Sequence, residues 1–135
     1  MSAKSQIYDS KCNDVLKESG VRFAAIINTD AKMISGGFKL GITPLEGDEQ
    51  KLNKFMEFAV KISLRSDYDN SLGALNYIAS RRDKVILISF PLPVSHNVLL
   101  VSAEPNIDIE KLANRIVKVF ADSSLSSDRG LSGTD

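Results

Sequence analysis

Apolar residues recur along this chain at spacings typical first of helices and then of strands. Residues at helical spacing predict a first helix over 5–19, whose apolar positions are Tyr8, Cys12, Val15 and Leu16. Nearly unbroken apolar residues over 21–28 predict a central strand that is covered on both faces. The segment 32–38 is shorter and more polar. It predicts a neighbouring strand with a bulge or an end at Gly36 and Gly37.

The segment 48–65 predicts a helix with more apolar surface than one core requires. At 100° per residue its apolar positions span roughly 240°, whereas the surface helix of a globular protein needs about 100°. They are Leu52, Phe55, Met56, Phe58, Ala59, Val60, Ile62 and Leu64. One side can pack on a sheet, so we expect a partner to cover the other side, most simply a second copy of the protein. The alternative is a helix wholly buried within one chain, between its sheet and the loop 40–45.

A group of three strands with short connections is predicted after a turn at 67–71. The three strands are predicted over 75–80, 84–90 and 97–103. Their short links are typical of an antiparallel meander. The first strand alternates, with Leu75 and Tyr77 on the same face. Helical spacing predicts a last helix over 108–121.

The predicted order of elements is α-β-β-α-β-β-β-α, which is typical of an α+β domain. The most apolar strands begin at Val21, Lys84 and Asn97, so we place them inside the sheet and the two polar strands at its edges. This gives a five-stranded antiparallel sheet of order 2-1-5-4-3, with two helices on one face and one helix on the other. We expect the domain to cover residues 1–122, and the residues 123–135, rich in Ser, Gly and Asp, to form a disordered tail.

The order of elements, the chain length and the broad apolar face of the second helix resemble the roadblock/dynein light chain family, within the wider profilin-like and longin-like group. More narrowly, the segments 21–28, 36–37 and 101–105 resemble a family of small uncharacterised archaeal proteins. The roadblock resemblance implies a homodimer, or a heterodimer with a paralogue, in which the second helices and third strands of two copies meet. It also implies a scaffold, an adaptor or a regulator of small GTPases. The narrower resemblance implies no known activity.

The partner interface expected from these observations combines the second helix with the third strand. One short loop can hardly cover the far side of that helix, so we place the helical part of the interface there. The residues predicted to form it are Met56, Val60, Leu64, Leu75 and Tyr77.

Basic residues gather at the predicted hairpin tip that follows the third strand. Arg81 and Arg82 lie there with Lys84, and Arg65 lies nearby if the second helix ends close to that strand. One interpretation is a docking corner for an anionic surface of a partner protein. The other is a charged tip that blocks stray pairing of the sheet edge.

Charge and composition narrow the classes of partner. Among 135 residues, 17 basic side chains balance 17 acidic ones, so no overall field draws the chain to nucleic acid or anionic lipid. The single Cys12 excludes an internal disulfide and fits a reducing compartment. The first residues lack the apolar region of a signal peptide, and no apolar run is long enough to cross a membrane. We therefore expect a cytoplasmic protein.

Few side chains are candidates for catalysis. His96 is the only histidine, which excludes a multi-histidine metal site. Cys12 lies on an apolar helical stripe, so we interpret it as a buried structural thiol, with a reactive thiol as the alternative. Gly36 and Gly41 have the glycine spacing of a phosphate-binding loop, but the lysine of that motif is missing. We expect no enzyme activity, cofactor or metal, and we keep a small-molecule sensor domain as the alternative function.

Overall fold

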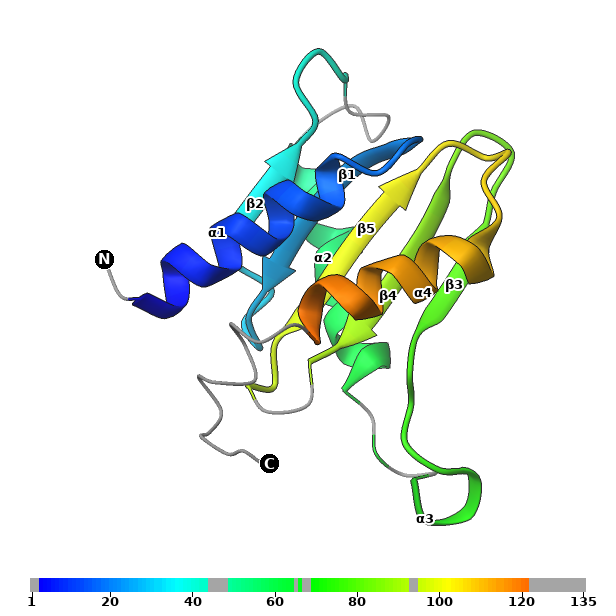
Figure 1. Ribbon diagram of the computed structural model, residues 1–135. Helices are drawn as coiled ribbons and strands as arrows, with labels where there is room; N and C mark the ends of the chain where they lie inside the picture. The colour runs from blue at the N-terminus through cyan, green and yellow to red at the C-terminus, as the bar shows by residue number, and fades with distance from the viewer. Residues whose placement is uncertain (1–2, 44–48, 65, 67–68, 93–94, 122–135) are drawn as a thin grey trace.

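A five-stranded antiparallel sheet forms the centre of the molecule, and helices cover both of its faces (Figure 1). The computed structural model describes residues 3–43, 49–64, 66, 69–92 and 95–121. The elements in chain order are α1 (Ala3–Leu16), β1 (Val21–Ile27), β2 (Met33–Phe38), α2 (Glu49–Ser63), α3 (Asp69–Leu72), β3 (Ile78–Arg81), β4 (Ile86–Pro91), β5 (Val98–Ala103) and α4 (Ile109–Phe120). The sheet order β2-β1-β5-β4-β3 confirms the predicted fold class. No helix among the described residues is long and apolar enough to cross a membrane.

The larger of two cores lies between the sheet and the helices α1 and α4, which share one face (Figure 1). Helical residues such as Cys12, Val15 and Leu112 pack there on alternate residues of the strands. Asp108 caps α4, because its side chain accepts a hydrogen bond from the amide of Lys111. The predicted distribution of helices, two on this face and one on the other, is therefore observed.

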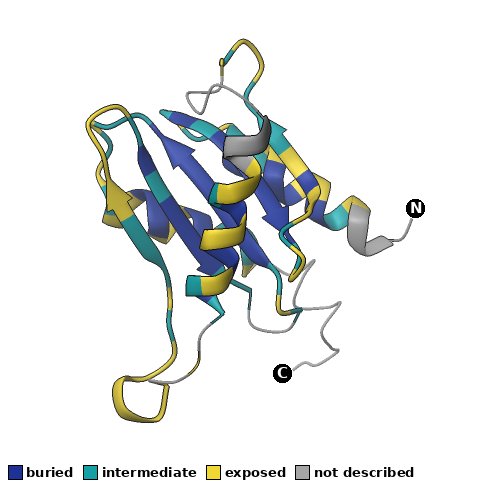
Figure 2. Ribbon diagram, turned by 180° about the vertical axis from the view of Figure 1, so that it is seen from behind, coloured by how far each residue is buried: buried dark blue, intermediate teal, exposed yellow. Residues whose placement is uncertain are grey.

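The second core lies on the opposite face of the sheet, beneath α2 alone. Its strand residues come from β1 and β5, with Phe23, Ile27 and Leu100 among them. Figure 2 shows α2 in front of these buried strands, with exposed residues along its outer side. Because one helix covers this face, strands beside α2 are less completely covered than the strands beneath it.

The edge strand β2 is irregular, but the bulge or strand end predicted at Gly36 and Gly37 is wrong, because these glycines pair in regular register and the strand continues to Phe38. The pairing register shifts between Ile26 and Ile27, and Gly36 and Gly37 both have positive φ angles, of 91° and 156°. A Cβ atom on Gly36 would lie 2.1 Å from the carbonyl oxygen of Ala24. Such irregularity disfavours pairing of this edge with another strand.

The main difference from the predicted elements lies between α2 and β3. Residues expected to form only a turn include the short helix α3, and β3 begins at Ile78 and not at Leu75. The sequence alternation continues towards Leu75, but the ladder with β4 ends at the pair Ile78 and Ser89. Pro91, which ends β4, has no amide hydrogen with which to extend that ladder. Leu75 and Tyr77 therefore lie in the connection before β3.

Candidate partner surface

The apolar residues of α2 divide between the core and the solvent. Met56 and Val60 are 3% and 7% exposed and lie in the core beneath the helix. Leu64 is half-buried against the same core. Phe58, by contrast, is 60% exposed. The burial of Met56 and Val60 differs from the expectation that they face a partner, because the helix rests on the sheet with the side that carries them.

The surface is hollowed near the end of α2. A hollow of about 570 Å³ lies between the end of α2, the segment around α3 and the start of β3. Ile62, one turn after Phe58, lines it together with Leu72, Leu75 and Ile78. Leu72 is itself 78% exposed. Because residues four apart share one side of a helix, Phe58 lies on the side of α2 that borders the hollow.

The strand β3 ends the sheet next to this hollow. The amide of Arg82 binds the carbonyl of Val85 across the β3–β4 turn. Because inward and outward backbone groups alternate along a strand, the amides and carbonyls of Ala79 and Arg81 point away from β4. No described strand pairs with that side of β3. Outward backbone groups, the hollow and Phe58 together form what we call the partner surface.

Tyr77, predicted for the same interface, lies mainly on the opposite side of the sheet. Its ring packs at 5.8 Å from the ring of Phe90, in the core shared with α1 and α4. Its hydroxyl donates a hydrogen bond to Glu110 at the start of α4, and this bond raises the pKa of Tyr77. Tyr77 also lines the hollow, so it joins the partner surface to α4. Of the five predicted interface residues, the structure brings only Leu75 and Tyr77 to the hollow.

Arg81 and Arg82 of the predicted docking corner are both exposed, but the side chain of Arg81 is bonded to the protein's own backbone. The guanidinium of Arg81 donates to the carbonyl oxygen of Pro105 and, at 3.2 Å, to that of Ile107. It therefore folds back onto the turn between β5 and α4. Arg82 is exposed at the hairpin tip, whereas Arg65 lies outside the described residues.

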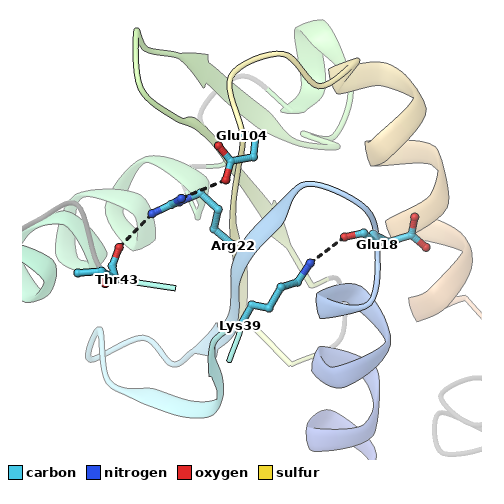
Figure 3. Close-up of polar contacts among 5 residues, drawn as sticks. All are labelled: Glu18, Arg22, Lys39, Thr43 and Glu104. Carbon is cyan, nitrogen blue, oxygen red and sulfur yellow. Dashed lines mark hydrogen bonds and ion pairs between the residues drawn. The ribbon is translucent and has the colours of Figure 1, made fainter. Parts of the chain in front are cut away.

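A second arginine reaches the same β5–α4 turn from the other side. Arg22 of β1 forms an ion pair of 3.1 Å with Glu104, the first residue of this turn, and also donates to the carbonyl oxygen of Thr43 (Figure 3). Nearby, Lys39 donates to the carbonyl oxygen of Glu18 at 3.3 Å (Figure 3). These contacts hold the segment that leaves β2 towards α2. The sequence analysis missed them, because nothing in the local pattern shows that residues 22 and 104 meet.

Among the described residues, few side chains are candidates for catalysis or metal binding. They contain no group of three or more His, Cys, Asp or Glu side chains that could hold a metal ion. Cys12 is fully buried, and burial raises its pKa from 9.0 to about 11, so the neutral thiol predominates at neutral pH. Ser35, which bonds this thiol, also donates a hydrogen bond to Asp9. His96 is exposed in the loop before β5.

A comparison with models of protein families shows which family this chain belongs to. A model for a family of unknown function (DUF6659) matches residues 2–124. The chain belongs to this family. Among curated protein sequences, none matches it. Membership in DUF6659 covers nearly the whole described chain but carries no activity with it.

Solved structures relate the fold of this DUF6659 protein to roadblock domains. It is similar to a Roadblock/LC7 domain from Streptomyces avermitilis, with 13% identity, a TM-score of 0.64, and 92% of this chain and 98% of that one covered. The gliding protein MglB from Thermus thermophilus has 12% identity and a TM-score of 0.68, with 95% and 94% covered. An MglB recorded in a tetrameric arrangement has 12% identity and a TM-score of 0.69, with 94% and 90% covered. At such identities the likeness establishes a roadblock-like fold and no more.

Proposed function

We propose that this protein is a dimeric interaction module that associates through its partner surface and acts as a scaffold, an adaptor or a regulator. The observation that carries the proposal is the exposed Phe58, one helical turn before Ile62, which lines an apolar hollow. The hollow is also lined by Ile78 of β3, whose outer edge pairs with no described strand. Large exposed aromatic side chains beside apolar hollows are typical of binding surfaces.

The partner surface has the two halves that a self-complementary interface needs. In a two-fold dimer the same patch of both copies meets, so a protruding group and its receptor must lie on one chain. Phe58 is such a protruding group, and the hollow lined by Ile62, Leu72 and Leu75 is such a receptor. The outward amides and carbonyls of β3 would add backbone hydrogen bonds between the copies.

Two further considerations support association. A neighbour with the same fold, MglB, is recorded in a tetrameric arrangement. The roadblock resemblance adds a small GTPase as the expected further partner of the dimer. The resemblance alone supports that partner.

Hydrogen exchange of the full chain tests the proposed surface. At high protein concentration the amides of Ala79 and Arg81, and those near Phe58, should exchange more slowly than in dilute protein, because the second copy covers them. Amides of the central strand β5 serve as the internal control, since they are buried in either state. Exchange at Ala79 and Arg81 that does not depend on concentration would contradict the proposal.

A small-molecule sensor is the second candidate, and one observation favours it. The hollow of about 570 Å³ is large enough for a small organic ligand. Native mass spectrometry of the purified protein should then show a mass above that of the chain alone. A protein that carries no ligand but dimerises would leave the interaction module as the better account.

A further inference from the structure

The turn between β5 and α4, residues 104–108, is contacted by one arginine from β3 and by another from β1. From one side Arg81, the last residue of β3, donates to the carbonyl oxygens of Pro105 and Ile107. From the other side Arg22 pairs with Glu104 (Figure 3). Both contacts join segments far apart in the sequence to one short turn.

The turn itself is held firmly in place. The amide of Glu104 donates to the carbonyl oxygen of Gly20 at 2.8 Å, and the amide of Ile107 donates to the carbonyl oxygen of Glu104. Ile107 also lies directly against Gly20, so closely that a Cβ atom there would come within 2.3 Å of its side chain. The side chain of Asp108 then caps α4. The turn is therefore a fixed point from which other segments can be positioned.

One side chain ties the strand edge of the partner surface to this fixed point. The strand β3 has four residues and, among the described strands, pairs only with β4. Tyr77, just before it, packs on Phe90 and bonds Glu110, and Arg81 fixes the other end of the strand. The guanidinium of Arg81 donates to two carbonyl oxygens from two different nitrogens, a planar arrangement that the single ammonium nitrogen of a lysine does not provide. A cation on an edge strand usually discourages pairing. Here the cation is turned back onto the molecule's own turn.

Arg22 makes a comparable pair of contacts on the other side of the turn. The guanidinium of Arg22 bonds Glu104 and also the carbonyl oxygen of Thr43, in the segment that follows β2. The Arg22 side chain is 14% exposed, so this pair is partly shielded from water. Arg81 thus connects β3 to the β5–α4 turn, and Arg22 connects the segment around Thr43 to the same turn.

We infer that the β5–α4 turn is a brace for the partner surface, and that Arg81 and Arg22 are positioning residues that fix β3 and the segment around Thr43 against it. This inference rests on the proposed function, because it concerns the readiness of the same surface to bind a second copy. The side chain of Arg81 does not itself contact the partner in this account. It keeps the outward backbone groups of β3 aligned, and so reduces the ordering cost of association.

The test compares neighbouring arginines in the full chain. Arg81→Met keeps a long aliphatic side chain but loses both hydrogen bonds, and Arg82→Met is the matched control at an exposed position. Sedimentation equilibrium should give a dimer Kd that is roughly tenfold higher for Arg81→Met than for the wild type, and little changed for Arg82→Met. Arg22→Met should weaken the dimer in the same direction.

A second variant separates bracing from charge. Arg81→Lys keeps the positive charge without the two-pronged donor, so it should weaken the dimer nearly as much as Arg81→Met. In protein diluted to monomers, the amide of Ser80, which points towards Leu87 of β4, should exchange faster in both Arg81 variants, while amides of β5 keep their rates. A loss of overall stability alone would accelerate exchange in all the strands and would overturn the inference.

The outcomes distinguish the two proposals. Two results would overturn the brace and leave the proposed dimer intact. One is a wild type that dimerises with the same Kd as Arg81→Met, and the other is an Arg81→Lys variant whose Kd equals that of the wild type. A wild-type chain that is monomeric at every concentration would refute the proposed function, and the exchange rate of the Ser80 amide in the variants would then decide on the brace alone.

Discussion

Replacement of Phe58 by alanine should separate association from folding. This side chain is 60% exposed on α2, whereas Met56, two residues earlier and so on nearly the opposite side of the same helix, is 3% exposed. Truncation of the first removes apolar surface that only a partner can cover, and truncation of the second opens a cavity in the core. The two variants should therefore affect different measurements.

The size of the effect of Phe58→Ala follows from its exposure. A phenylalanine side chain has roughly 200 Å² of surface, so 60% exposure leaves about 120 Å² in water. At ~25 cal/mol per Å², its complete burial contributes about 3 kcal/mol per copy and about 6 kcal/mol per symmetric dimer. Ordering costs reduce the measured value, and alanine keeps part of the area. We expect a loss of about 2 kcal/mol or more, equivalent to a Kd roughly 30-fold higher.

Two assays on the full chain are needed. Sedimentation equilibrium gives the Kd, and urea denaturation of dilute protein gives the free energy of unfolding of the monomer. For Phe58→Ala that free energy should stay within about 0.5 kcal/mol of the wild type. Met56→Ala should lower it by about 2 to 5 kcal/mol. Lys61→Ala, at an exposed position on α2, is the control that should change neither quantity.

Either of two results would refute this reasoning. A dimer whose Kd is the same in Phe58→Ala and in the wild type would place the interface elsewhere on the molecule. A monomer that loses several kcal/mol of stability in Phe58→Ala would show that this residue packs inside the chain.

Three smaller perturbations test the cores and the sheet. Gly36→Ala should lower the free energy of unfolding in urea by ~2 kcal/mol or more, because φ is 91° and the new Cβ would lie 2.1 Å from the Ala24 carbonyl oxygen; wild-type stability would contradict this. Since the pKa of Cys12 is about 11 in the folded chain and 9.0 ordinarily, only the unfolded thiol loses its proton between those values. The free energy of unfolding should therefore fall by up to about 2 to 3 kcal/mol as pH rises from 9 to 11, and Cys12→Ala should lack this component in urea titrations across that range. Ser63→Ala should be neutral or stabilising by up to about 1 kcal/mol in thermal unfolding, because the buried hydroxyl has no hydrogen-bond partner among the described residues; a clear loss of stability would reveal a bond to it.

The order of strands in the sheet was predictable because the apolar or polar residues of each strand indicate how deeply that strand is buried. The unbroken apolar run of β1 lies between two strands and under helices on both faces, as such a run predicts. The polar strands β2 and β3 lie at the edges. The start of β3 was misplaced because strand length depends on the partner: Pro91 on β4 ends the ladder, although alternation continues to Leu75.

The candidate site was less predictable because it depends on how elements meet. A helical wheel shows that α2 has excess apolar surface, but not which side faces the sheet, so Met56 and Val60 were placed outward when they lie in the core. Phe58 was in the apolar arc, but only packing reveals that it is exposed. The ties of Arg81 and Arg22 to one turn join segments many residues apart, and no local pattern records them.

The most direct test of the account is the solution mass of the full chain, measured by light scattering over a series of protein concentrations. The chain has a mass of 14.8 kDa. We predict that the measured mass doubles as concentration rises, and that Phe58→Ala shifts this transition to higher concentration. A mass that stays at 14.8 kDa throughout the series would contradict the central claim that the partner surface binds a second copy.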